Sequence, residues 1–171
     1  MPVPKRRDAG SGAARPLAAR QAGADLYRRD LYTWALQQAA ALRAGDLEQL
    51  DLTNLAEEIQ DLGSEQLHKL TSAYRVILIH MLKWDHQPAR RTRSWVTSID
   101  SHRALAGDVI EDSLGLQSRQ DLALSRAYRR ARSGASGEAG LDTGVFPPSC
   151  PYTLEEVMSR KFSWPQKSGT R

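Results

Sequence analysis

A long helical rhythm of apolar residues, running from Asp51 to about His86, restricts the fold of this chain more than any other feature. Steps of three or four positions separate the members of this stripe, which are Leu55, Ile59, Leu62, Gln66, Leu70, Tyr74, Ile77, Met81 and Trp84. Such spacing places them on one face of an α-helix. The rhythm keeps its phase through Gly63, and Pro88 disfavours a helical conformation in the residue before it. The sequence therefore predicts one long helix, with Gly63 as the place for any kink and the stripe as the central core.

The segment before it also predicts a helix. Its apolar stripe is made of Tyr27, Leu31, Trp34, Ala35, Gln38 and Leu42. Asp25 suits the N-cap because its carboxylate can accept from free backbone amides, and Gly45 suits the C-cap.

Beyond Pro88 the pattern stays helical. The sequence predicts a helix from about Trp95 to Glu111, with Ser94 near its cap, and then a weaker helix over 122–131. A long surface loop is predicted from Ser133 to Pro151. Basic residues in the weaker helix suit the negative end of its dipole. Thr153 and Glu156 then have the spacing of a capping box, which opens a short last helix. The sum is an all-α fold: an irregular helical bundle of four main helices plus a short C-terminal helix.

Length and composition favour a single domain. A chain of 171 residues with 40% hydrophobic content supports one core, which we assign to 25–165 as a single all-helical domain. Residues 1–24 have little to bury and predict a disordered basic tail, and 166–171 predict a flexible C-terminus. The single cysteine, Cys150, excludes an intrachain disulfide, and no apolar run is long enough for a membrane span. We expect a cytoplasmic protein.

Charge is distributed unevenly. The 1–24 tail holds five bases and one acid, which equals the whole formal charge of +4 and leaves the folded part neutral. Within that part, 46–65 is acidic without a base, whereas 83–103 is mainly basic. A neutral folded part argues against nucleic acid as the main partner.

Four blocks together are similar to a known family. They are RDLYTWALQQAAALRAG, LDLTNLAEEIQDLG, VILIHMLKWDHQPARRTRSW and FPPSCPYTLEEV. In this order and spacing the chain resembles the bacterial domain of unknown function 29 family from about Leu26 to Trp164. The resemblance implies an all-helical fold, and it implies no established activity, cofactor or catalytic residue.

Several chemistries lack the residues they need. The chain has no phosphate-binding G-x-x-x-x-G-K loop, and one cysteine with four scattered histidines gives no zinc pattern. Glu65 and His68 form a single E-x-x-H step, but a di-iron bundle needs two, so we expect both to face solvent. We therefore predict no catalytic residues, no metal and no cofactor, and leave open whether the protein is an enzyme.

The segment 83–95, called the 83–95 junction below, is the candidate site for an anion. A helix end and the start of the next helix bring together His80, Lys83, Trp84, Arg90, Arg91, Arg93, Ser94 and Trp95. Arginine forks and free amides at a helix N-terminus both favour a phosphate-type ligand. The structural alternative, which we favour, makes both tryptophans core residues and pairs the arginines with Glu57, Glu58 and Asp61.

Glu57 and Glu58 are the polar partner candidates. Adjacent residues lie about 100° apart on a helix, so only one of them faces the apolar stripe, and Glu58 lies closer to it. An inward Glu58 beside His80 or an arginine could act as a general base. A structural salt bridge is the alternative interpretation of the same residue.

These observations favour an uncharacterised small helical protein that acts as an interaction or binding module for a partner protein. The alternative is a nucleic-acid or phosphate binder using the 83–95 junction. An enzyme acting on an anionic substrate is the third hypothesis.

Overall fold

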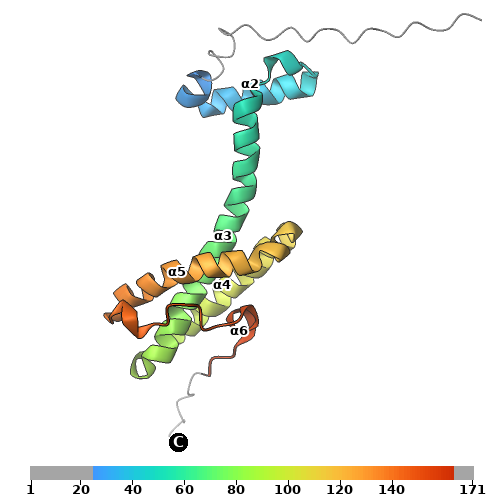
Figure 1. Cartoon of the computed structure of the whole chain (residues 1–171). Coiled ribbons are helices and arrows are strands. Elements are labelled where there is room, and N and C mark those ends of the chain that lie inside the picture. The colour runs from blue at the N-terminus through green and yellow to red at the C-terminus, as the bar shows by residue number, and fades with distance from the viewer. Residues whose placement is uncertain (1–24, 164–171) are drawn as a thin grey trace, which may run out of the picture. The chain divides into compact units, whose positions relative to one another are not determined.

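The structure is a computed structural model that describes residues 25–163, and this part of the chain is all-α (Figure 1). The tail at 1–24 and the C-terminus at 166–171, for which disorder was predicted, lie outside the described residues. Residues 25–29 are helical, and the main helices that follow are α2 (Leu31–Ala44), α3 (Leu52–His86), α4 (Arg93–Asp112), α5 (Gln120–Ala139) and α6 (Leu154–Ser159). The predicted four main helices and short C-terminal helix are confirmed. Within 25–163, no helix is long and apolar enough to cross a membrane.

Two compact units divide the chain. The N-terminal unit is Met1–Asp61 and the C-terminal unit is Leu62–Arg171. The predicted long helix is confirmed as α3, which passes through Gly63 without a break and so contributes residues to both units. Glycine in a helix interior costs about 1 kcal/mol relative to alanine.

The N-terminal unit is built around α2. Asp30, not Asp25, is the N-cap of this helix, since its side chain accepts from the amide of Thr33 at 3.0 Å. Asp25 instead lies inside the short helix at 25–29, because the chain breaks its helical path at Asp30. Gly45 ends α2 in the left-handed conformation with φ of 69°, which confirms its predicted role.

The predicted stripe on α2 divides into two faces. Trp34 and Gln38 are buried, together with Ala41, and the ring of Tyr27 meets that of Trp34 edge-on at 4.9 Å. Leu31 and Leu42 are about half exposed. The prediction of a single buried stripe was therefore wrong in part. Apolar residues occur on almost every side of this helix, so their spacing alone does not determine which side is buried.

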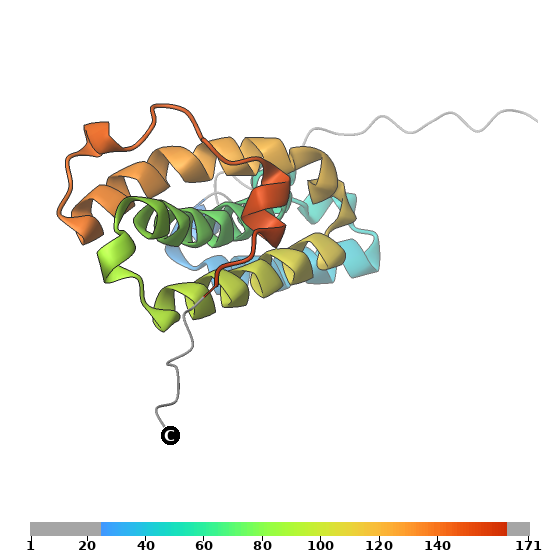
Figure 2. The same cartoon turned by 90° about the horizontal axis from the view of Figure 1, so that it is seen from below.

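The C-terminal unit contains the main core. Buried side chains of α3, α4 and α5 form one cluster, and α6 with the segment before it adds Phe146 and Val157. Figure 2 shows the ribbons of these helices in green to red. Gly134 of α5 lies against Ile79 of α3 so closely that a Cβ at this position would come within 2.8 Å of the isoleucine side chain.

The second half of the α3 stripe is core, as predicted, and the first half is not. From Leu70 to Trp84 its members are buried, with Ile77 and Met81 fully so. Ile59 and Leu62 are 66% and 65% exposed, which corrects the prediction of a continuous buried stripe. The start of α3 has the apolar pattern of a core helix, but no neighbouring element within the described part of its own unit covers these exposed side chains.

Two boundaries differ from the sequence prediction. Thr92, not Ser94, is the N-cap residue of α4, which begins at Arg93. The α5 helix continues to Ala139 and ends at Gly140 with φ of 67°, so the first part of the predicted 133–151 loop is helical. Alanines at 135 and 139 pack inward there, a signal hidden by the surrounding glycines and serines.

The last segment is tied down by side-chain contacts. The predicted capping box is confirmed: the Thr153 side chain accepts from the amide of Glu156, and the Glu156 side chain accepts from that of Thr153. Arg160 donates to both oxygens of Asp85 at 2.6 and 2.8 Å, and the hydroxyl of Tyr152 donates to the same carboxylate at 2.8 Å. These bonds hold the chain end against α3.

Candidate interaction surfaces

The 83–95 junction contains an inner group of side chains that are already occupied. Lys83 is 7% exposed, its Nζ lies 2.7 Å from Glu138 of α5, and it stands over the ring of Trp95 at 4.5 Å. Arg91 donates from Nε to the carbonyl of Trp84 at 2.9 Å and stacks on the Trp84 ring. Two of the expected anion ligands therefore hold the end of α3 in place.

His80 belongs to the same inner group. Its ring stacks with that of Trp95 at a centroid distance of 6.4 Å, and its Nδ1 is buried without a hydrogen-bond partner among the described residues. Burial, helped by the nearby charge of Lys83, lowers the pKa of His80 below its usual value. A neutral imidazole at this place contributes no positive charge to an anion site.

The outer part of the junction faces solvent. Arg90 is exposed on a short 3₁₀ turn over Pro88–Arg90, and Arg93 is exposed in the first turn of α4. The Ser94 hydroxyl shares a hydrogen bond of 2.8 Å with that of Thr92. Of the expected anion ligands, these are the ones that stay open to solvent.

The two glutamates of the N-terminal unit differ in their surroundings. Glu58 accepts from the hydroxyl of Tyr27 at 2.7 Å, and this hydrogen bond raises the pKa of Tyr27 to about 12. Glu57 is exposed. Glu58 therefore serves as an acceptor that links the 25–29 helix to α3.

The sequence prediction missed an exposed apolar surface on α2. It consists of four large side chains that are at least half exposed, Leu31 at 50%, Tyr32 at 75%, Leu36 at 55% and Leu42 at 53%, and is called the apolar α2 face. At 3.6 residues per turn these positions fall within an arc of roughly 140°, whose centre lies about 130° around the helix from the buried Trp34, and span about 16 Å of helix. The sequence signal for it is that α2 is apolar on nearly all sides, because such helices are usually covered on more than one face.

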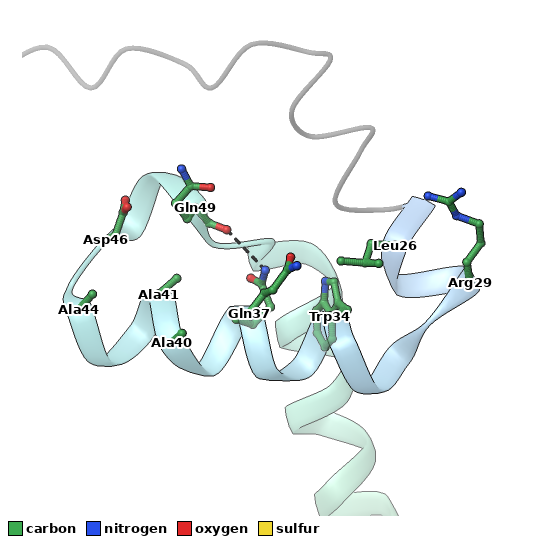
Figure 3. A pocket seen from close by; sticks show the side chains of 10 residues that line it. Leu26, Arg29, Trp34, Gln37, Ala40, Ala41, Ala44, Asp46 and Gln49 are labelled. Atoms are coloured by element: carbon green, nitrogen blue, oxygen red, sulfur yellow. Dashed lines mark hydrogen bonds between the residues drawn. The ribbon is translucent and has the colours of Figure 1, made fainter.

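A groove of about 700 Å³ lies on another side of α2 (Figure 3). It is lined by Leu26, Arg29, Trp34, Gln37, Gln38, Ala40, Ala41, Ala44, Asp46 and Gln49. Gln38 is held in place because its Oε1 accepts from the amide of Asp51 at 2.7 Å. The indole N–H of Trp34 is buried and has no acceptor among the described residues.

The E-x-x-H step and the cysteine lie outside the 83–95 junction. Glu65 and His68 are exposed, as predicted, and Glu65 pairs with Lys69 at 3.0 Å. Burial raises the pKa of the Cys150 thiol, which is the opposite of what a nucleophile needs. Among residues 25–163, no group of three or more His, Cys, Asp or Glu side chains is arranged to hold a metal ion.

Comparison with known families decides the relationship of the chain. The family described as domain of unknown function DUF29 matches residues 26–163. This chain belongs to that family. The resemblance seen in the sequence is thereby confirmed over nearly the whole described region. No curated protein and no solved structure matches the chain, and the matching family is described only as a domain of unknown function.

Proposed function

We propose that this protein is a binding module that docks a partner protein on its N-terminal unit. The single observation that carries the proposal is the apolar α2 face, where four large side chains are at least half exposed. Contiguous exposed apolar patches often mark interaction sites, because contact between apolar side chains and water is unfavourable. We place this function in the cytoplasm, where a single half-buried thiol at Cys150 stays reduced.

The small core of the N-terminal unit supports the proposal. Among residues 25–61, the described part of this unit, the buried apolar residues are Trp34, Ala41 and Leu50. Folded segments shorter than about 40 residues rarely bury enough surface to be stable without a metal, a disulfide or a partner. A partner covering the apolar α2 face supplies the missing burial.

The spacing on α2 indicates a helical partner. Leu31, Ala35 and Leu42 lie along one line of the helix, with Tyr32 and Leu36 beside it. Lines of residues at steps of three and four are what one helix presents to another when their side chains interdigitate. The partner segment is therefore an amphipathic helix with a complementary apolar stripe.

Charge determines what flanks that stripe. Residues 25–61 hold eight acids and three arginines, a formal charge of −5. Two copies of such a surface repel each other, whereas a helix with lysine or arginine beside its apolar stripe is attracted. The proposed occupant is thus a basic amphipathic helix of a different protein.

Panning the full chain against a displayed library of helical peptides tests this. We expect enriched peptides with apolar residues at steps of three and four and basic flanks, and we expect Leu36→Glu to abolish their binding. The matched control is Leu114→Glu, which changes a leucine of the C-terminal unit that is 67% exposed. Equal binding loss in both variants, or no enrichment, rejects the proposal. Sedimentation showing a dimer that Leu36→Glu dissociates identifies a second copy as the occupant instead.

A second candidate function is phosphate or nucleic-acid binding at the 83–95 junction. The observation in its favour is that Arg90, Arg93 and Ser94 are all exposed within five positions of the chain. Its test is the response of anion binding to Arg93→Gln, which is included in the experiment below. The third hypothesis, an enzyme acting on an anionic substrate, gains no support from an inward general base, because Glu58 is hydrogen-bonded to Tyr27.

A further inference from the structure

Three arginines gather on one face of α5. Arg126, Arg129 and Arg130 are three and four positions apart, so their side chains project from the same side of the helix. A stabilising effect on the helix dipole does not explain them, because that effect is confined to the last turn and α5 continues to Ala139. Their placement in mid-helix needs another reason.

The three side chains line a cavity of about 210 Å³ together with His68 and Thr71 of α3. Thr71 is 5% exposed and forms a buried wall, held by the bond from its hydroxyl to the carbonyl of Leu67 at 2.7 Å. His68 is exposed at the rim, where even a neutral imidazole offers one N–H donor. The cavity thus combines a fixed wall with several donors.

Among residues 25–163, no carboxylate forms an ion pair with Arg126, Arg129 or Arg130. The ion pairs that join residues within 25–163 use other bases, namely Lys69, Lys83, Arg103 and Arg160. The neighbouring Arg132 is likewise engaged, since its Nε donates to the carbonyl of Phe146 at 3.1 Å. Arg126 and Arg130 form a like-charge pair four residues apart, which destabilises a helix by a few tenths of a kcal/mol. An anion between them would remove that repulsion.

We propose that this cavity binds a phosphate-type oxyanion, held by Arg126, Arg129 and Arg130 with His68 at the rim. Guanidinium groups present paired N–H donors that match the oxygens of a tetrahedral anion. At about 30 Å³ for each water of the liquid, the cavity has room for one phosphate or diphosphate group. It is smaller than the roughly 300 Å³ at which pockets for drug-sized ligands begin.

The surroundings favour a small ligand over a nucleic acid. Residues 62–163 carry 14 bases and 11 acids, a formal charge of +3, whereas a domain that binds a phosphate backbone is typically strongly basic. The ligand is free phosphate or diphosphate, or the same group at the end of a nucleotide. The site lies wholly in the C-terminal unit and is independent of the apolar α2 face.

Isothermal titration calorimetry on the full chain tests the proposal. The probes are inorganic phosphate, diphosphate and adenosine triphosphate at about 10 mM ionic strength, where exposed charges are least screened, with a single-stranded oligonucleotide as a fourth arm. We expect saturable binding with one site for phosphate or diphosphate, at least tenfold weaker in Arg129→Gln. Arg119→Gln, which changes an exposed arginine outside both candidate anion sites, is the matched control and should bind as the unchanged chain does, while Arg93→Gln tests the 83–95 junction.

Each other outcome has a defined meaning. Tighter binding of adenosine triphosphate that is still lost in Arg129→Gln identifies a nucleotide as the source of the phosphate. The proposal is overturned if binding does not saturate at tens of millimolar phosphate and diphosphate. It is also overturned if Arg93→Gln weakens anion binding as much as Arg129→Gln does. Tight binding of the oligonucleotide alone also overturns it. Because Arg129 is exposed, its variant folds, and Arg126→Gln provides an independent repeat.

Discussion

The N-terminal and C-terminal units use the same kind of apolar sequence in opposite ways. In the C-terminal unit, apolar stripes of α3, α4 and α5 meet in one core in which Ile77 is fully buried. In the N-terminal unit, the same α3 pattern leaves Ile59 66% exposed, and α2 carries a second apolar face that nothing within the unit covers. The contrast shows that helical periodicity predicts a helix with an apolar side. Whether that side is buried depends on another element packing against it, and the apolar stripe does not reveal which element that is.

The largest expected effect comes from removing core volume in the C-terminal unit. Ile77→Ala should lower the free energy of unfolding by about 2–5 kcal/mol, because a packed helical core cannot collapse around the lost atoms. Chemical denaturation followed by far-ultraviolet circular dichroism measures this. A loss below about 0.5 kcal/mol, the range of surface substitutions, would erase the difference between the two units.

An intermediate effect is expected at the charged contact that closes the C-terminal unit. Burial by itself raises the pKa of the Asp85 carboxyl, but hydrogen bonds from Arg160 and Tyr152 outweigh it and lower that pKa below its usual value. The folded protein therefore binds this proton less readily than the unfolded chain does. The stabilisation is complete above the ordinary aspartate pKa of about 3.9 and is lost as pH falls through the lowered value.

Asp85→Asn should accordingly flatten the fall of unfolding free energy below about pH 4 and lower stability at neutral pH. Denaturant midpoints measured from pH 2 to pH 7 give both quantities. Asp112→Asn, which removes an exposed carboxylate at the end of α4, is the control. If the two variants show the same acid dependence, the Asp85 contact does not distinguish this unit.

The smallest effect is expected from Ile59→Ala on α3. The substitution removes the same atoms as Ile77→Ala from the same helix, but the side chain is 66% exposed, so the change should stay within about 0.5 kcal/mol. The same denaturation experiment measures it. A cost near 2 kcal/mol would show that Ile59 is covered in solution, and the proposed shortage of burial in the N-terminal unit would be wrong.

Most of the fold could be predicted because helical spacing and capping are local signals. The long α3 helix, Gly45 as a C-cap and the Thr153–Glu156 capping box all depend on residues within a few positions of each other. The end of α5 was missed because the inward alanines at 135 and 139 gain their meaning only from α3, which lies far away in the sequence.

The candidate sites were harder to predict for the same reason. The bases near Pro88 were open to two interpretations, an anion site or a structural cluster of ion pairs, and we favoured the second. In the structure the partner of Lys83 is Glu138, which is separated from it by 55 positions. The arginines of α5 received a local explanation that ceased to apply once the helix proved longer. Which bases are free to bind a ligand is a property of tertiary pairing, and sequence spacing does not report it.

The contact between Gly134 and Ile79 has a consequence for how this family varies. Because a Cβ at position 134 would lie 2.8 Å from Cδ1 of Ile79, a relative with alanine or serine there must either turn the end of the isoleucine side chain aside or carry a smaller residue at that place. Alanine at position 134 should therefore occur both with isoleucine in another rotamer and with valine, and the close approach of α5 to α3 is adjusted by the end of one side chain.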